Sequence, residues 1–351
     1  MTGTQFLSNT ATMVGGGVGV NGPATLNGGV FQGNSSANMG GGLYVDDTTG
    51  ISNSTFAANS ATTGGGLYNS GALTLTNSTF AANSATMGGG LHNKAGGRLW
   101  LRNTLIAGNS GGDCAGAGAI VQNANNLVQD GSCAAALHGD PVLAPHGDYG
   151  GGTQTLALLP GSPAIDAGDG ALCPAADQRG AARVAGACDI GAFESRGFQI
   201  AVTGGSPQAT AVNSPFAAPL QALVSSAHGE PAGPGGRITF TPPPAGAGIN
   251  LVTPITVATD VSGSAALAVS ANIKAGSYGI NASASGVVAP ATFALTNLPL
   301  QLVADKVGDG RGRVTSVLPV LDCGLTCTAN LDYGAQVTLA ATAEAGSTFT
   351  G

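Results

Sequence analysis

The sequence predicts an all-β protein that opens with a right-handed parallel β-helix. Phenylalanine returns every 24 or 25 residues in the first units, and an asparagine follows three residues after each one. A glycine triplet then precedes an aliphatic residue, as in the run that ends at Leu43. A period this short, without a 3.6-residue helical pattern, suits one coil of three short strands joined by bends.

The phenylalanine and asparagine positions are expected to stack as two columns along the axis. Neighbouring coils lie about 4.8 Å apart, so each side chain meets its copy in the next coil. We expect the phenylalanines to fill the interior and the asparagines to link their side-chain amides along the axis. The columns are Phe6, Phe31, Phe56 and Phe80, with Ile106 in a fifth unit, and Asn9, Asn34, Asn59, Asn83 and Asn109.

Glycine and small polar residues complete the coil. Glycine triplets such as residues 40–42 are expected at corners, where glycine adopts a positive φ at little cost. Threonine, serine, asparagine and alanine are expected on the outer face, and Thr55 points to that face because strand side chains alternate. Only Asp46, Asp47 and Lys94 are charged among the first 97 residues.

The composition argues against a protein that binds nucleic acid. Charged residues make up 8% of the chain, against about 25% in an ordinary soluble protein. The 11 basic and 18 acidic residues leave a net charge of −7, so the basic stripe that contacts a nucleic-acid backbone is absent. A hydrophobic content of 43% favours folded cores over disorder.

Changes in composition divide the 351 residues into four segments. Residues 1–110 hold the β-helix repeats. Residues 111–197 are expected to cap the β-helix, because an open solenoid end exposes apolar side chains and unpaired strand edges. Residues 198–298 predict a β-sandwich, and residues 299–351 a small incomplete β-repeat. Because the chain starts and stops within a pattern, we expect it to be part of a longer protein.

The six cysteines form three local pairs, which predicts disulfides and an oxidising compartment. A metal site is the alternative, but no histidine accompanies any pair at zinc-finger spacing. No stretch of 18 or more apolar residues could span a bilayer, and no export signal is visible. The pairs are Cys114 with Cys133, Cys173 with Cys188, and Cys323 with Cys327.

The repeat unit resembles a family of bacterial surface proteins. Phe-x-x-Asn followed by Gly-Gly-Gly-[Val/Leu] is similar to the paired motifs of polymorphic outer membrane protein repeats in bacterial adhesins. The segment from Asp113 to Glu194 resembles the module that closes β-helices in choice-of-anchor proteins, through runs such as residues 161–168 and 188–194. These resemblances imply a pectin-lyase-like solenoid. The chain departs from the family at Val184, where proline is usual.

The second half resembles two further bacterial modules. The order of strand and turn motifs from Gln208 to Asn297 is similar to a bacterial immunoglobulin-like domain of group 1, which implies a rigid spacer or adhesive module. The segment from Leu300, with its Cys323-Gly-Leu-Thr-Cys327 run, resembles an internalin-type B repeat.

Together these features predict a non-enzymatic bacterial protein, secreted or at the cell surface or outer membrane. Its expected partner is a host or environmental surface glycan or protein, bound through the β-helix. We expect no catalytic residue, cofactor or metal, because acid–base catalysis needs a positioned pair of titratable groups and the rod carries one acidic pair at a bend. Two alternatives stay open: a β-helix polysaccharide lyase or glycoside hydrolase, and a calcium site formed by Asp166, Asp177 and Asp189.

Overall fold

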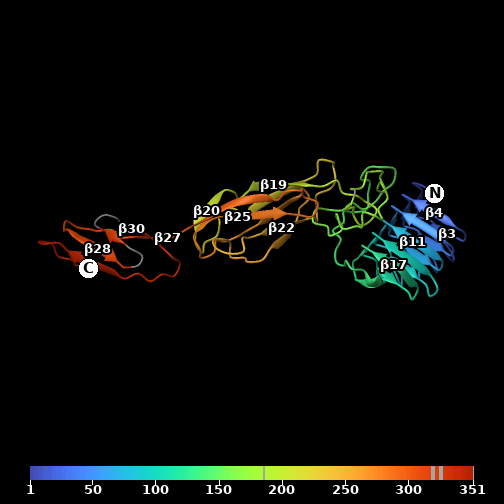
Figure 1. The fold of residues 1–351 in the computed structure, drawn as a ribbon, viewed down its shortest axis with the longest axis horizontal. Helices are drawn as coiled ribbons and strands as arrows, with labels where there is room; N and C mark the ends of the chain where they lie inside the picture. The colour runs from blue at the N-terminus through green and yellow to red at the C-terminus, as the bar shows by residue number, and fades with distance from the viewer. Residues whose placement is uncertain (185, 318–320, 324–326, 351) are drawn as a thin grey trace.

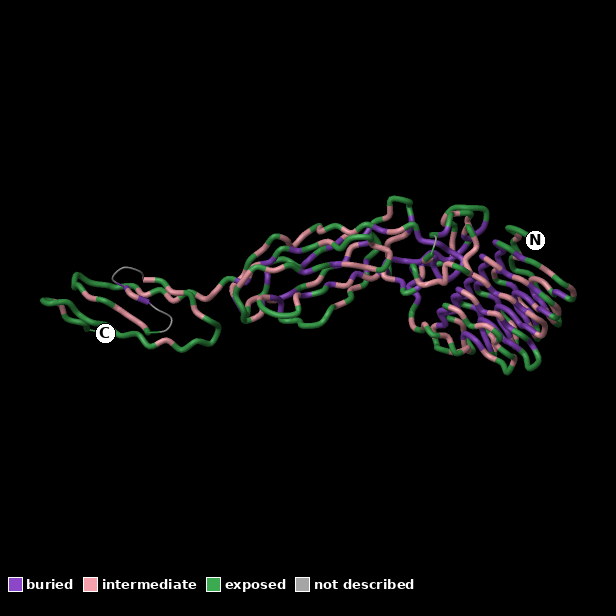
Figure 2. The backbone as a smooth tube through the Cα atoms, viewed as in Figure 1, coloured by how far each residue is buried: buried purple, intermediate pink, exposed green. Residues whose placement is uncertain are grey.

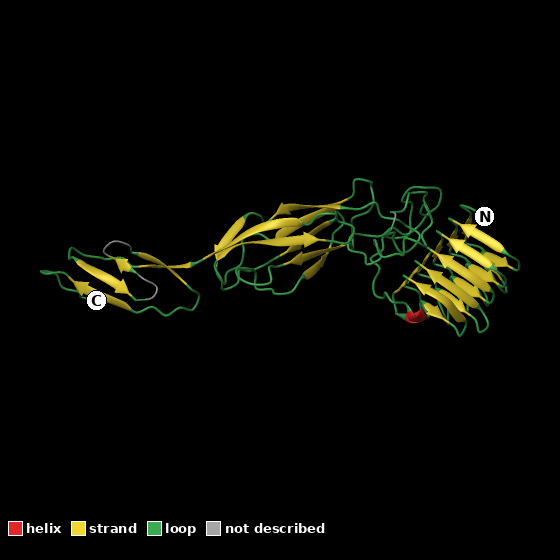
Figure 3. Cartoon of the chain, in the orientation of Figure 1, coloured by secondary structure: helices red, strands yellow, loops and turns green. Residues whose placement is uncertain are grey.

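The computed structural model shows an elongated protein made almost entirely of β-strands (Figure 1). It describes residues 1–184, 186–317, 321–323 and 327–350. A rod of parallel strands at the N-terminal end leads into a body of two sheets and then into a small group of antiparallel strands. Short strands joined by turns make up each part (Figure 3).

The N-terminal part is a parallel β-solenoid of about 5 turns. Each coil adds one strand to each of three sheets, and equivalent residues pair, as Phe6 does with Phe31 and Leu43 with Leu67. The first sheet contains β1 (Gln5–Leu7), β5 (Val30–Gln32), β9 (Thr55–Ala57), β12 (Thr79–Ala81), β15 (Leu105–Ala107) and β18 (Leu127–Val128). The second contains β3 (Val18–Val20), β7 (Leu43–Val45), β10 (Leu67–Asn69), β13 (Leu91–Asn93) and β16 (Cys114–Ala115). The third contains β4 (Ala24–Asn27), β8 (Thr49–Ser52), β11 (Ala72–Thr76), β14 (Arg98–Arg102) and β17 (Ala119–Ala124). A further short pair, β2 (Thr10–Ala11) and β6 (Ser35–Ser36), joins the first two coils.

Alternation along the strands fills the inside of the rod. In β11, Leu73 and Leu75 are buried, whereas Ala72, Thr74 and Thr76 are partly exposed. Leucine, isoleucine, valine and phenylalanine side chains from all three sheets form one buried cluster along the axis. The same alternation of buried and exposed positions is visible along the rod in Figure 2.

The glycine triplets serve two different needs at one corner. Gly40 has a φ of 66°, which a residue with a side chain rarely adopts. A Cβ on Gly42 would lie 2.6 Å from the carbonyl oxygen of Gly66 in the next coil. The first glycine therefore provides the bend, and the third allows neighbouring backbones to approach closely.

The segment expected to cap the rod is divided between two places. The turn that includes η1 (Ser132–Ala134) closes the last coil, where Cys133 and Ala135 pack against the apolar axis. Residues 141–195, here called the flank segment, instead lie along the outside of the first sheet. The outward Leu105 and Leu127 are apolar and need cover, and they belong to the same buried cluster as the flank segment.

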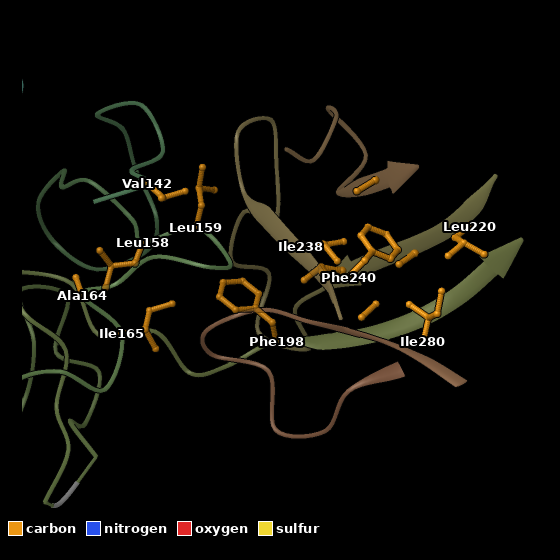
Figure 4. Packing of buried hydrophobic residues seen from close by; sticks show 14 of the residues in the cluster. Val142, Leu158, Leu159, Ala164, Ile165, Phe198, Leu220, Ile238, Phe240 and Ile280 are labelled. Atoms are coloured by element: carbon orange, nitrogen blue, oxygen red, sulfur yellow. The ribbon is translucent and has the colours of Figure 1, made fainter. Parts of the chain in front are cut away.

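The two-sheet body follows the flank segment. One sheet pairs β19 (Gln199–Gly204), β21 (Leu220–Ser225) and β24 (Ser264–Leu267). The other has the order β20 (Gln208–Ala211), β26 (Ala291–Leu298), β25 (Gly276–Ser283), β22 (Arg237–Thr241) and β23 (Ile255–Ala258). Pairing is antiparallel except between β20 and β26. The buried cluster between the sheets continues into the flank segment, where Ile165 and Leu159 lie near Phe198 and Ile238 (Figure 4).

The C-terminal part contains two small antiparallel sheets. One pairs β27 (Leu300–Val303) with β30 (Thr328–Leu331), and the other places β28 (Gly312–Ser316) between β29 (Asp322–Cys323) and β31 (Leu339–Ala343). Every residue of β31 is exposed. Throughout the described parts of the chain, no helix has the length and apolar character needed to cross a membrane.

Candidate functional site

The phenylalanine column lies inside the rod on the first sheet. Phe31, Phe56 and Phe80 are fully buried, and their ring centroids are 4.4 Å apart with nearly parallel planes. Phe6 stacks on Phe31 at 4.8 Å and is partly exposed in the first coil. Buried Ile106 continues the column in the fifth coil.

The asparagine column is a hydrogen-bonded ladder at the corner that follows the first sheet. At each step the Nδ2 of one asparagine donates to the Oδ1 of the asparagine in the next coil at 2.9 Å. From the second coil onward, each Nδ2 also donates to the phenylalanine carbonyl of the previous coil. The ladder runs through Asn9, Asn34, Asn59, Asn83 and Asn109. Asn34, Asn59 and Asn83 are buried, so the ladder satisfies their amides and holds the coils in register.

The ladder ends on Asp113, which the repeat pattern did not single out. Asp113 Oδ1 accepts hydrogen bonds from Asn109 Nδ2 at 2.9 Å and from its backbone N–H at 3.1 Å. Burial raises the pKa of Asp113, and the hydrogen bonds from Asn109 and Asp130 offset part of that effect. Its Oδ2 accepts from the backbone N–H of Asp130, so this carboxylate ties the last coil to the closing turn. The sequence could have indicated this role, because Asp113 follows the last asparagine of the repeat by four residues.

The structure confirms the three expected disulfides. Cys114–Cys133 joins the last strand of the second sheet to the closing turn, with Cα atoms 5.7 Å apart. Cys173–Cys188 links two parts of the flank segment, with Cα atoms 6.6 Å apart. Cys323–Cys327 closes a short loop in the C-terminal part.

The outer face of the first sheet is not a free surface, contrary to the expectation for Thr55. Thr55 is fully buried beneath the flank segment, and its Oγ1 lies 2.9 Å from Thr155 Oγ1 and donates to Gln178 Oε1 at 2.6 Å. One coil further along, Thr79 Oγ1 accepts from the N–H of Ala192 at 2.9 Å. The first sheet is therefore unavailable to a large ligand at these coils.

The flank segment holds a buried group of charged side chains. Arg183 Nη1 pairs with Glu194 Oε2 at 2.8 Å, and Arg179 Nε pairs with Asp177 Oδ2 at 2.9 Å. Burial, reinforced by the nearby charge of Glu194, raises the pKa of Asp189 well above its usual value. These charged side chains are therefore paired with one another and almost fully buried.

Two of the three acids proposed as calcium ligands, Asp177 and Asp189, accept hydrogen bonds from backbone N–H groups, whereas Asp166 is exposed. Asp177 Oδ1 accepts from the N–H groups of Arg179 and Ala181, and Asp189 Oδ1 accepts from that of Asp166. Among the residues that the structure describes, no group of three or more His, Cys, Asp or Glu side chains could hold a metal ion. These carboxylates shape the turns of the flank segment.

The second sheet carries a short aromatic column on its outer face. Tyr44 stacks on Tyr68 with ring centroids 5.6 Å apart, and Tyr68 stacks on His92 at 5.1 Å. Burial lowers the pKa of His92, so its ring is neutral at neutral pH. Tyr68 and His92 are largely buried by this stacking, and the column leaves little ring surface for a ligand.

The third sheet presents the most accessible polar face of the rod. Its five strands lie side by side in the order β17, β14, β11, β8 and β4, and Figure 1 labels β4, β11 and β17 along the rod. Trp100, the single tryptophan of the chain, is partly exposed on β14, and Arg98 Cζ lies 5.2 Å from its ring centroid. On the far side of the tryptophan, Arg102 Nε donates to Gln122 Oε1 at 2.7 Å. The repeat pattern missed this group because its residues occur in one coil only.

A cavity of about 500 Å³ lies beside one corner of the third sheet. On the rod side, the lining includes Asn27, Ser52 and Asn53; on the other, it includes residues 174–180 of the flank segment. Strand pairing places Asn27, Ser52, Thr76 and Arg102 in one column, so the cavity continues the face that carries the tryptophan.

Comparisons with protein-family models, with curated proteins and with solved structures found no match. The fold and the site therefore define the class of this protein on their own: a disulfide-bonded parallel β-solenoid followed by smaller, mostly antiparallel sheets.

Proposed function

We propose that this chain is a non-enzymatic binding module of a secreted or surface-exposed bacterial protein. The β-helix takes a glycan or protein ligand, and the following domains hold it away from its point of attachment. The observation that carries the proposal is the open outer face of the third sheet, which displays a tryptophan and two arginines.

The placement of the titratable side chains supports binding rather than catalysis. Between residues 48 and 112 the sequence contains no acidic residue, whereas acid–base chemistry on a glycan needs a carboxyl pair beside the bound sugar. The buried acids of the flank segment, Asp177, Asp189 and Glu194, accept hydrogen bonds from backbone N–H groups or from buried arginines. They are committed to the fold.

The wider architecture supports display at a surface. We propose that the β-helix is right-handed and belongs with the polymorphic outer membrane protein repeats, with the flank segment corresponding to the choice-of-anchor module. The two-sheet body is proposed to be an immunoglobulin-like spacer, and the C-terminal part an internalin-type B repeat. Three disulfides favour an oxidising location outside the cytoplasm.

An adhesion assay tests this function. Beads coated with the full chain should adhere to surfaces coated with glycans or host proteins and should release when soluble ligand is added. Beads coated with reduced and denatured chain are the matched control. No adhesion above this control on any glycan or protein surface would contradict the proposed function.

A further inference from the structure

We propose that the face of the third sheet around Trp100 binds an anionic saccharide. The indole ring would contact the sugar, and Arg98 and Arg102 would pair with its carboxylate or sulfate groups. The inference rests on the proposed function, because it names the ligand class that the β-helix takes.

Charge on this face has the opposite sign to that of the whole chain. The chain has a net charge of −7, yet residues 48–112 contain Lys94, Arg98 and Arg102 and no acidic residue. A local positive field on an acidic protein attracts anions to that place. The nearest acids in sequence lie outside this stretch. Asp46 and Asp47 are at the turn before β8, where Asp46 Oδ1 accepts from Ser70 Oγ at 2.7 Å, and the carboxylate of Asp113 accepts from Asn109 and Asp130.

The three side chains share one face by strand alternation. Arg98, Trp100 and Arg102 are alternate residues of β14, between the buried Leu99 and Leu101. The two arginine Cα atoms are therefore about 13 Å apart along the strand, with the indole midway. The two arginines therefore flank the indole along one strand.

Both arginines have donors to spare. Within the described part of the chain, neither forms an ion pair with an acidic side chain. Arg98 is exposed and lies over the indole, while the bond from Arg102 Nε to Gln122 leaves its Nη groups for a ligand. A guanidinium binds carboxylate or sulfate through paired, charge-assisted hydrogen bonds.

The surface beside the indole is low enough to admit a sugar ring. Thr25, Gly50 and Thr74 hold the matching positions in the three preceding coils, and all are far smaller than tryptophan. A Cβ on Gly50 would meet open space. A pyranose can therefore lie against the part of the indole that Arg98 leaves uncovered, where its C–H groups contact the aromatic ring.

A long nucleic acid fits this surface poorly. Between residues 113 and 197 the chain has nine acidic and three basic residues. A polyanion that extended beyond the third sheet would meet this negative charge, whereas a saccharide with separated charges need only meet the arginines.

Calorimetric titration of the full chain tests the inference. The probes are an oligogalacturonate, a heparin-derived oligosaccharide and a neutral malto-oligosaccharide of equal length, with a DNA duplex as a further polyanion. We expect at least one acidic oligosaccharide to bind at least about tenfold more tightly than the neutral one, and binding to weaken as salt rises.

Variants locate the site. Arg98→Ala/Arg102→Ala should weaken acidic-oligosaccharide binding at least about tenfold and remove most of its salt dependence. Trp100→Ala should weaken binding at least about fivefold, and Trp100→Phe should retain most of it. Lys274→Ala/Arg311→Ala removes two exposed cations elsewhere and should leave binding unchanged. Circular dichroism during heating checks that each variant is folded.

Each contrary result overturns a distinct part of the proposal. Acidic-oligosaccharide binding that survives the arginine and tryptophan variants places the site elsewhere, and the proposed function stands. Equal affinity for the neutral oligosaccharide or for DNA overturns the ligand class. Adhesion to proteins alone rejects the saccharide inference and leaves the proposed function intact, whereas no adhesion at all rejects both.

Discussion

At the scale of single residues, the stacked phenylalanines are central to the stability of the rod. Phe56 is fully buried between rings on both sides, so Phe56→Ala should lower the free energy of unfolding by about 3–5 kcal/mol through lost transfer energy and a cavity. Exposed Met87→Ala should change it by less than about 0.5 kcal/mol. Chemical denaturation followed by Trp100 emission measures both changes, and equal losses would refute the role of the column.

His92 makes the stability of the rod depend on pH. Burial lowers its pKa in the folded chain, so the unfolded chain takes up a proton first as the pH falls. The contribution of His92 is full above about pH 6.5 and is lost as the pH falls through its folded pKa. His92→Phe keeps a ring against Tyr68 but cannot be protonated. As the pH falls from neutral to mildly acidic, the denaturation midpoint of the wild type should therefore drop by more than that of this variant. If the two midpoints change in parallel with pH, His92 does not have this effect.

At the scale of elements, the flank segment and the first sheet depend on each other. Thr55 is buried and bonded to Thr155 and Gln178, so Thr55→Ala leaves buried partners unsatisfied and should cost about 1–3 kcal/mol. Thr25→Ala, on the exposed third sheet, should stay within about 0.5 kcal/mol of wild type. Thermal unfolding compares the two, and a similar small loss at both would mean that the flank segment does not cover this face.

The elements that repeat were the ones that sequence could predict. Phe31, Asn34 and the glycines at 40–42 recur in register, and stacking of identical residues follows from a fixed period. The three cysteine pairs were likewise short-range, and each pair forms the expected disulfide.

The position of the flank segment follows from contacts that no local pattern encodes. Thr55 contacts Thr155, which is 100 residues further along the chain. The alternation of side chains along the strand predicts that Thr55 faces outward, but it does not predict which segment covers it. The sequence analysis did not identify Trp100 for a related reason: a residue that occurs in one coil only is not part of a repeating pattern. The repeat therefore predicted the solenoid, whereas neither the position of the flank segment nor the candidate site around Trp100 could be predicted from it.

At the scale of the whole molecule, a buried carboxylate joins the flank segment to the two-sheet body. Glu230 accepts from the N–H of Arg196 at 3.0 Å and lies 3.6 Å from Arg179 Nη1 in the flank segment. Glu230→Gln leaves Arg179 short of one partner and should cost about 2 kcal/mol or more. Exposed Glu344→Gln should cost less than about 0.5 kcal/mol.

Calorimetry should then show how far the two parts unfold together. Because one buried cluster spans the junction, we expect a single main transition for the rod and the two-sheet body. Separate transitions in wild type, unchanged by Glu230→Gln, would argue that the junction is loose. A stiff junction suits a protein that holds its binding face away from a surface.

We expect the β-helix to bind a glycan through its third sheet without transforming it. One incubation of the full chain with an acidic oligosaccharide tests this, with Trp100 emission and the mass of the sugar as the two measurements. We expect the emission to change with ligand concentration, because Trp100 is the single tryptophan and lies on the proposed face, and we expect the sugar to be recovered at its original mass. Either the formation of shortened or unsaturated products or the absence of any emission change would contradict this.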